Sequence, residues 1–307
     1  MMQNVGLVGT HDNGKDLTQQ LVNKISEKDE LQRKYLMNWK ISASERNEFN
    51  SILHFFMEEF QYNMDYIADT YCFINQMVRE ETYYFIHHGK YRNSNFAEVN
   101  RLVYDNPEYM EKYMMGLAVS DYIWINHIKM LRYFEENLDR FEGTRYLEIG
   151  PGYGQYLIRA LLGGKFEKYC ACDISKTSVA GSNKFLKFRN LADRCMVEEK
   201  DFFEYNSEEF DCIVMGEVLE HVEQPLLMLK KIYGLLHKEG KAFITTVINA
   251  PTLDHIFLFG NIEQVLNLAN ETGFRIVDYM CSTEGDIPLE KAIKRKQAIN
   301  VAMILEK

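Results

Sequence analysis

The chain has 307 residues, of which 46% are apolar and 26% charged, and its formal net charge is −10. A chain of this length can bury a sizeable core in one large domain or two ordinary ones. The acidic balance offers no general positive field for a phosphate backbone, so we expect no nucleic-acid partner. The N-terminal stretch MMQNVGLVGTHDNGKD lacks the features of a secretory signal, and no apolar run reaches the roughly 18 residues of a membrane span. We therefore expect a cytoplasmic protein without a membrane partner.

The first third of the chain is predicted to be helical. Glycine and proline are scarce between residues 15 and 141, and apolar residues recur there at helical spacing. Ser42 and Glu45 have the spacing of a capping box ahead of an apolar helix face. Asn106 and Pro107 form another helix start, with an N-cap followed by proline at the first helical position. The many aromatic and methionine side chains of this region are expected to be mainly core or interface residues.

From residue 144 onward the pattern changes to short apolar runs separated by helical stretches, which is typical of a parallel α/β sheet. The seven strands are expected near 144–149, 168–173, 195–199, 210–215, 241–248, 274–281 and 298–305. The helices are expected near 153–163, 176–189, 224–237 and 260–272. A polar segment too short for a full crossover helix precedes the last strand, so that strand is expected to run antiparallel.

Three glycines lie between the first predicted strand and the helix after it. Gly150, Gly152 and Gly154 allow the backbone to turn sharply and to approach a ligand without a Cβ in the way. The free N–H groups of the following helix face that ligand, so a nucleotide-like cofactor is the expected occupant. The spacing is G-x-G-x-G preceded by Glu148. Gln155 stands where the dinucleotide fingerprint requires glycine or alanine, which argues against NAD.

Acidic residues end the second and third predicted strands. Asp173 ends the second strand, 19 residues beyond Gly154, at a position where such folds hydrogen-bond ribose hydroxyls. Asp173 could instead serve only as a cap for the helix that follows. Asp201 and Phe202 follow the third strand, where an acid and an aromatic ring could meet the amine and the ring face of adenine.

These segments resemble the motifs of class I S-adenosylmethionine-dependent methyltransferases. Residues 148–154, Asp173, the pair 201–202 and the sequence GEVLEHV at 216–222 occur in the order and spacing of that family. They look closest to the branch that contains the ubiquinone-biosynthesis O-methyltransferases. The resemblance covers roughly residues 118–307 and implies a Rossmann-like, seven-stranded, mostly parallel sheet with flanking helices. The helical first third resembles no family that we can name.

The resemblance also implies how the cofactor S-adenosylmethionine is bound. The glycine loop, together with Glu148, would hold the methionine part of the cofactor. Asp173 would bind the ribose, and Asp201 with Phe202 would contact the adenine. Glu217, in the GEVLEHV segment, would line the cofactor pocket.

Two histidines are candidates for a direct part in the chemistry. His221 follows the fourth predicted strand and His255 follows the fifth, at the carboxyl edge of the sheet where ligands bind in such folds. Either imidazole could act as a general base near neutral pH for a hydroxyl nucleophile. Asp254 adjoins His255, but side chains of adjacent residues rarely face each other.

A divalent metal site is the alternative interpretation of these residues. Glu217, Glu220 and His221 occur at i, i+3 and i+4, so a helical turn would place them on one face, and His255 could complete the site. Some ubiquinone-type O-methyltransferases and small-RNA 2′-O-methyltransferases carry E-x-x-E-H with a divalent ion. Many metal-free relatives also carry EVLEHV, in which Glu and His cap a helix or line the cofactor pocket. The sequence leaves both interpretations open.

We therefore predict an S-adenosylmethionine-dependent methyltransferase that acts on a small molecule, with oxygen as the expected acceptor. Residues 1–117 would form a helical domain that caps the pocket or forms a homodimer, and residues 118–307 would form the cofactor-binding domain. The alternatives are N- or C-methylation of a small metabolite, methylation of a carrier- or peptide-bound substrate, and a non-catalytic cofactor-binding protein of the same fold.

Overall fold

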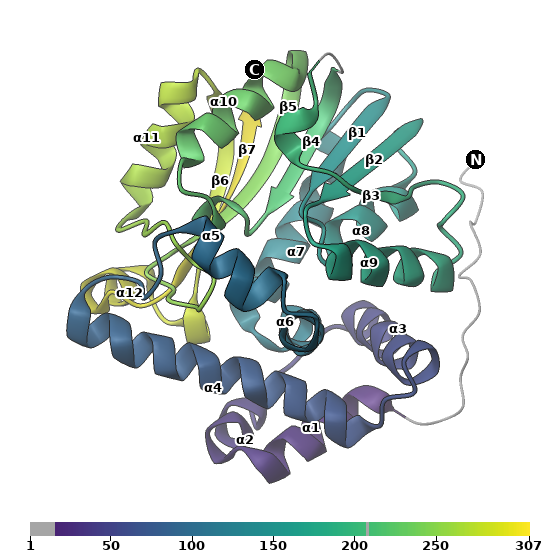
Figure 1. Cartoon of the computed structure of the whole chain (residues 1–307), viewed down its shortest axis with the longest axis vertical. Helices are drawn as coiled ribbons and strands as arrows, with labels where there is room; N and C mark the ends of the chain where they lie inside the picture. Colours follow the sequence, from purple (N-terminus) through teal and green to yellow (C-terminus); the bar gives the residue numbers. More distant parts are fainter. Residues whose placement is uncertain (1–15, 207–208) are drawn as a thin grey trace.

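The computed structural model describes residues 16–206 and 209–307. Its centre is a seven-stranded sheet with the strand order β3-β2-β1-β4-β5-β7-β6 (Figure 1). The strands are β1 (Arg145–Ile149), β2 (Lys168–Asp173), β3 (Val197–Glu199), β4 (Phe210–Gly216), β5 (Leu236–Ile248), β6 (Arg275–Thr283) and β7 (Ile299–Glu306). Strands β1 to β5 pair in parallel, and β7 runs antiparallel between β5 and β6. The predicted fold class and the antiparallel last strand are therefore confirmed.

The register of the central strands brings several carboxyl ends to one edge of the sheet. Ile149, the last residue of β1, pairs with Cys172 of β2 and with Met215 of β4. The glycine loop after β1, the end of β2 at Asp173 and the segment after β4 therefore leave the sheet side by side. This edge is where ligands bind in open parallel sheets.

Helices cover both faces of the sheet (Figure 1). Helices α7 (Ile125–Asn137), α8 (Gln155–Gly163) and α9 (Lys176–Phe188) pack on one face, and α10 (Pro225–Leu235) and α11 (Ile262–Thr272) pack on the other. Tyr146 of β1 points into the first apolar cluster, whereas Leu147 and Ile149 point into the second, as the alternation of a strand requires. A short helix that the sequence did not predict, α12 (Leu289–Arg295), connects β6 to β7.

The first third of the chain is helical, as predicted, and lies at the edge of the sheet where the parallel strands end (Figure 1). Its elements are α1 (Leu17–Lys28), α2 (Glu30–Leu36), α3 (Ala43–Glu59), α4 (Met64–His88), α5 (Phe96–Val99), the π-helical turn η1 (Asn100–Tyr104) and α6 (Pro107–Ile123). The capping box of Ser42 and Glu45 is present at the start of α3. Asn106 caps α6, and Pro107 occupies its first turn.

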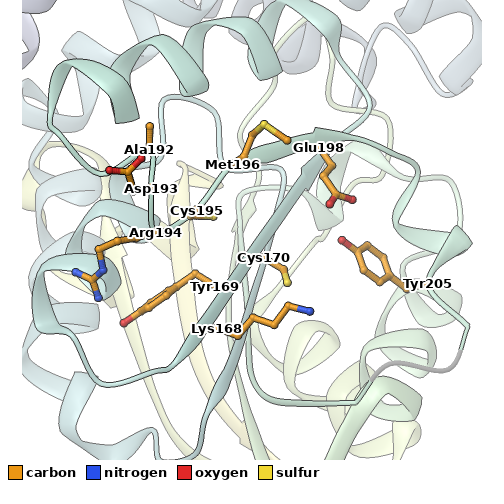
Figure 2. A pocket seen from close by; sticks show the side chains of 10 residues that line it. All are labelled: Lys168, Tyr169, Cys170, Ala192, Asp193, Arg194, Cys195, Met196, Glu198 and Tyr205. Carbon is orange, nitrogen blue, oxygen red and sulfur yellow. The ribbon is translucent and has the colours of Figure 1, made fainter.

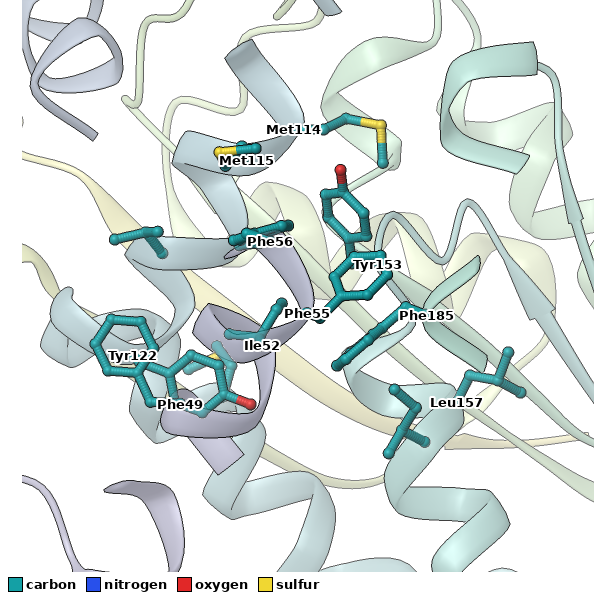
Figure 3. Close-up of a cluster of buried hydrophobic side chains, with 14 of the residues drawn as sticks. Phe49, Ile52, Phe55, Phe56, Met114, Met115, Tyr122, Tyr153, Leu157 and Phe185 are labelled. Atoms are coloured by element: carbon teal, nitrogen blue, oxygen red, sulfur yellow. The ribbon is translucent and has the colours of Figure 1, made fainter. Parts of the chain in front are cut away.

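The N-terminal helices and the sheet layer share one apolar core. Figure 3 shows this core, to which α3, α6, α8 and α9 contribute side chains. The ring of Phe55 in α3 lies 4.8 Å from that of Phe185 in α9 and 5.9 Å from that of Tyr153 in the glycine loop. Phe49 of α3 stacks on Tyr122 of α6 at 4.9 Å. Burial of these rings attaches the helices firmly to the α/β part of the chain.

No helix within residues 16–206 and 209–307 is long and apolar enough to cross a membrane. The expectation about a secretory signal concerns residues 1–16, and residues 1–15 lie outside the described part of the chain. The predicted domain boundary after residue 117 stays a prediction and would fall inside α6. A homodimer formed through the N-terminal helices also stays a prediction.

Helices α4 and α6 approach each other closely at Gly116. A Cβ at this position would lie 2.3 Å from Ile74 Cγ1 and 2.6 Å from the carbonyl oxygen of Thr70. We therefore expect Gly116→Ala to lower the free energy of unfolding by about 1–3 kcal/mol through overpacking. In the control Gly234→Ala in α10, the added Cβ meets no heavy atom within 4 Å, so stability should rise by about 0.5–1 kcal/mol. Urea denaturation measures both changes, and a neutral Gly116→Ala would contradict the packing argument.

Candidate cofactor and active site

The glycine loop joins β1 to α8 through backbone that only glycine adopts easily. Gly150, Gly152 and Gly154 have φ values of +64°, +56° and +77°. A Cβ on Gly150 would lie 2.8 Å from Val218 Cγ2, so this position is closely packed. A Cβ on Gly152 would meet nothing within 4 Å, so the backbone there borders open space. A ligand can therefore approach the main chain at Gly152, as the sequence predicts for a cofactor loop.

A cavity of about 190 Å³ lies beside this loop. Three polar atoms of its lining residues, Glu148 Oε1, Gln155 Nε2 and Glu217 Oε1, are buried without a hydrogen-bond partner among the described residues. Leaving a buried polar atom unpaired costs roughly 1–3 kcal/mol, so the set indicates a polar ligand. Two carboxyl groups and an amide N–H suit the ammonium and carboxylate groups of an amino acid. These residues therefore fit the methionine part of S-adenosylmethionine.

The helices supply a second wall of the cavity, which the sequence analysis missed. Asp121 of α6 and His127 of α7 line it, with Asp121 Oδ1 3.2 Å from His127 Nδ1. Asn126 donates a hydrogen bond of 2.8 Å to Asn300 Oδ1, and Asn300 donates one of 3.0 Å to Glu217 Oε2. These contacts join α7, β7 and the end of β4. No sequence motif marks them, because their partners are far apart in the chain.

Asp173 lies at the end of β2, next to the glycine loop. Its Oδ1 accepts a hydrogen bond of 2.8 Å from the backbone N–H of Ser175. Burial raises the pKa of Asp173 to about 6, although hydrogen bonds from the backbone of Ser175 and Ile174 act in the opposite direction. The N-cap of α9 is Ser175, so Asp173 is not needed as the cap. An ionised carboxylate here can accept hydrogen bonds from ribose hydroxyls, and that role stays a prediction.

Asp201 and Phe202 have clear structural roles in addition to the predicted adenine contacts. Asp201 is exposed, and its Oδ1 accepts a 2.9 Å hydrogen bond from the backbone of Phe203 at the turn η3 (Phe202–Glu204). Phe202 is 3% exposed and lies 6.4 Å from the ring of Tyr205 in the second apolar cluster. The contacts of both residues with adenine stay predictions.

A second group of polar residues lies beyond the ends of β4 and β5. One ligand atom from each of Glu220, His221 and His255 lies within 4.8 Å of the other two. Glu220 and His221 belong to the turn η4 (Leu219–His221), and His255 belongs to the loop after β5. Glu217 is not part of this group. Its left-handed backbone, with φ of +52°, places it before the helical turn rather than on the face that the sequence spacing predicted.

Hydrogen bonds identify the proton-bearing nitrogen of each histidine ring. His221 Nδ1 lies 3.1 Å from the carbonyl oxygen of Asp254, and His255 Nδ1 lies 2.5 Å from that of Ala250. Because a carbonyl oxygen only accepts, each Nδ1 carries the proton and each Nε2 keeps its lone pair. His255 Nε2 lies 3.9 Å from Glu220 Oε1, which has no hydrogen-bond partner within residues 16–206 and 209–307.

Burial shifts the pKa values of Glu220 and His255. Burial raises the pKa of Glu220 well above its ordinary value, and the nearby Glu217 carboxylate adds to the effect. Burial and the neighbouring His221 lower the pKa of His255 to about 3. His255 is thus a neutral but weak base, and a neutral imidazole is also the form that binds metal ions. The carboxyl group of Glu220 and the imidazoles of His221 and His255 can together accept a proton or a divalent cation.

A larger depression of about 340 Å³ lies elsewhere, near the amino end of β2 (Figure 2). It is lined by Lys168, Tyr169 and Cys170 of β2 and by residues of the loop before β3, including Arg194. Because the glycine loop and Asp173 lie at the opposite, carboxyl end of these strands, this depression is separate from the candidate site.

The sheet, the glycine loop and the cavity together have the features of an α/β domain with a site for a nucleotide-like cofactor. Residues 147–242 match the family model described as a methyltransferase domain. A ubiquinone biosynthesis O-methyltransferase of Coxiella burnetii is 26% identical over 144 residues, which cover 47% of this chain and 59% of that protein. The chain thus matches less than two thirds of that relative's length. Residues 147–242 of this chain thus match a methyltransferase domain.

Two solved structures share the fold. The mitomycin 7-O-methyltransferase MmcR has a TM-score of 0.54 at 13% identity, with coverage of 80% of this chain and 70% of that one. PigF, solved with SAH, has a TM-score of 0.56 at 14% identity, with coverage of 80% and 74%. Each alignment covers 80% of this chain, which is more than residues 118–307 contain. The likeness in fold therefore extends into the N-terminal helices.

Glu148 makes stability depend on pH. It is 1% exposed, and burial raises its pKa to about 8, although a hydrogen bond from Tyr146 acts in the opposite direction. The folded protein keeps this proton up to about pH 8, whereas the unfolded chain releases it near the ordinary value of 4.5. The stabilising contribution is therefore complete below pH 4.5 and is lost as the pH rises through 8.

We predict that Glu148→Gln, which cannot ionise, removes this part of the pH dependence. Its free energy of unfolding relative to wild type should increase between about pH 5 and about pH 9. Denaturant titrations at several pH values provide the measurement. Glu198→Gln, on the exposed side of β3, is the control and should retain the wild-type profile. Parallel profiles for Glu148→Gln and wild type would contradict the assignment.

Proposed function

We propose that this chain transfers a methyl group from S-adenosylmethionine to a hydroxyl oxygen of a small molecule. The observation that carries the proposal is the cavity beside the glycine loop, with its three unpartnered polar atoms. It lies at the same edge of the sheet as Glu220, His221 and His255. The matched methyltransferase domain supports the cofactor. The relatives named as O-methyltransferases support oxygen as the acceptor.

Methyl transfer places modest chemical demands on the protein. When bound, S-adenosylmethionine supplies a methyl group that is already activated by a positively charged sulfur. The protein has to align the acceptor, exclude water and remove a proton from a hydroxyl acceptor. The N-terminal helices suit the exclusion of water because they lie over the carboxyl edge of the sheet (Figure 1). His221 or His255 would take the hydroxyl proton at Nε2 if no metal ion participates.

Glu220, His221 and His255 would hold a divalent ion if one participates. Carboxylate oxygen and imidazole nitrogen are suitable donors for such ions. Glu220 Oε1, which has no hydrogen-bond partner among the described residues, and the two imidazoles fit this use. Glu217, the fourth predicted ligand, has one oxygen bonded to Asn300 and one without a partner. A bound ion would lower the pKa of a hydroxyl group that it contacts.

Cofactor binding can be tested at the glycine loop and at β2. Gly152→Val should abolish binding because its side chain would occupy the space where the cofactor approaches the backbone. Gly164→Val is the matched control, since Gly164 also has a positive φ, of +65°, and open space around a Cβ. Asp173→Ala should weaken binding by about 1.5–3 kcal/mol, the usual worth of a charged hydrogen bond. Isothermal titration with S-adenosylmethionine measures each affinity. Unchanged affinity in a folded Asp173→Ala protein would refute the ribose assignment.

The role of His255 can be tested by mutation together with chelation. His255→Ala should lower turnover by about 100- to 10,000-fold, the usual contribution of a general base, and leave cofactor affinity nearly unchanged. His237→Ala, at a partly exposed histidine near the start of β5, is the control. Loss of activity with a chelator and recovery with a divalent ion would support the metal role. Unchanged activity with a chelator would support the base role, and a fully active His255→Ala protein would exclude both.

A further inference from the structure

The connection between α4 and α5 holds the loop that carries His255. Tyr91 Oη accepts a hydrogen bond of 3.1 Å from the backbone N–H of Ala250. Asn93 Nδ2 donates one of 2.7 Å to the carbonyl oxygen of Leu253. The loop after β5 therefore takes its shape partly from residues that lie about 160 positions earlier in the chain.

Asp254, in the same loop, is a buried carboxylate held by hydroxyl groups. It is 1% exposed. Its Oδ2 accepts hydrogen bonds from Tyr113 Oη at 2.7 Å and from Tyr104 Oη at 3.4 Å, and its Oδ1 accepts one from Thr252 at 2.8 Å. Burial alone would raise the pKa of Asp254, but the nearby His221 and His255 and these hydroxyl groups lower it overall. Two of the three hydroxyl donors come from the N-terminal helices.

Tyr104 and Asp254 lie beside one nitrogen, Nδ1, of the His221 ring. His221 Nδ1 lies 3.1 Å from Tyr104 Oη, 3.1 Å from the carbonyl oxygen of Asp254 and 3.4 Å from Asp254 Oδ2. Tyr104 has a single hydroxyl proton, which the carboxylate of Asp254 attracts, so its oxygen faces Nδ1 as an acceptor. All three neighbours of Nδ1 are then acceptors. They keep the proton on Nδ1 and leave the lone pair on Nε2.

The backbone that carries Tyr104 is itself unusual. Tyr104 is the last residue of the π-helical turn η1 (Asn100–Tyr104), in which the N–H of Asp105 reaches back to the carbonyl oxygen of Asn100 at 2.7 Å. The wider turn changes the direction of the side chains relative to an α-helix. Such turns are frequent at functional sites. Asp254 is buried, whereas Tyr104 and His221 are only partly buried, so this pair lies on the more accessible side of the network.

We propose that Tyr104 and Tyr113, together with Asp254, are positioning residues that fix the tautomer and orientation of His221 for the reaction. The inference rests on the proposed function, because it assigns a use to the free Nε2 of His221. It gives the N-terminal helices a direct part in the active site, beyond covering it. Outer residues that orient a histidine in this way typically affect metal affinity or activity by about 10- to 100-fold.

The test uses the full-length protein and the variants Tyr104→Phe, Tyr113→Phe and Asp254→Asn. The first two remove one hydroxyl group and keep the ring, so the packing is preserved. Tyr109→Phe is the matched control, because Tyr109 lies in α6 like Tyr113 but its buried hydroxyl has no hydrogen-bond partner in the described part of the chain. Nitrogen-15 NMR of the imidazole groups reports which nitrogen of His221 carries the proton. Steady-state kinetics, titration with S-adenosylmethionine and titration with Mn²⁺ complete the measurements.

We expect the wild type and Tyr109→Phe to hold the proton of His221 on Nδ1. Tyr104→Phe should shift part of the population to the Nε2–H form and lower kcat by about 10-fold, with unchanged affinity for S-adenosylmethionine. Tyr113→Phe should likewise increase the population of the Nε2–H form and lower kcat. Asp254→Asn should have the largest effect, about 100-fold on kcat, if it folds. If Mn²⁺ binds the wild type, the variants should bind it more weakly. The variant with the lowest kcat should also have the lowest affinity for Mn²⁺.

The inference would be overturned if Tyr104→Phe and Tyr113→Phe left the tautomer of His221 unchanged, whatever happened to kcat. It would also be overturned if Tyr109→Phe had the same effects as the other two variants. Failure of the proposed function looks different, because then the wild type itself would bind no S-adenosylmethionine or transfer no methyl group. The tautomer measurement needs neither cofactor nor substrate, so it decides the positioning role in either case.

Discussion

The packing of the N-terminal helices against the sheet layer is the constraint on which the rest of the structure depends. Phe49 and Phe55 of α3 lie against rings of α6, α9 and the glycine loop, so burial of apolar surface fixes the helices at the carboxyl edge of the sheet. The hydrophobic effect thus brings the helices over the site, and hydrogen bonds such as that from Tyr113 to Asp254 add directional contacts. Once the helices are in place, Asp121 completes the cavity beside the glycine loop and Tyr104 reaches His221.

Because the helices cover the site, its polar groups are buried and the pKa values of several of them are shifted. Water is largely excluded, so a charge must find a partner or be suppressed. Glu148 and Glu220 have raised pKa values for this reason, and His255 has a lowered one. Asp254 shows the opposite outcome, because neighbouring histidines and hydroxyl donors offset its burial. The same low-dielectric surroundings would strengthen contacts with a charged cofactor or a metal ion.

Much of the candidate site follows from sequence position in a parallel sheet. Gly150, Gly152, Asp173 and His221 directly follow or end strands, and parallel strands bring their carboxyl ends to one edge. Glu217 marks the limit of this reasoning. Its spacing from Glu220 suggested one helical face, but a left-handed backbone turns Glu217 towards the cofactor cavity and Asn300. Spacing alone does not specify the backbone conformation that decides which residues meet.

The sequence by itself determined the strands, the helix starts and the cofactor loop, because these depend on residues within a few positions of one another. The capping box of Ser42 is such a local feature, and so are the three glycines with positive φ. Only the tertiary structure decided that Tyr104 would meet His221, 117 positions away, and that Asn126 would meet Asn300, 174 positions away. Such contacts depend on how whole helices pack on the sheet. That packing is set by the summed burial of many apolar side chains, which no local pattern encodes.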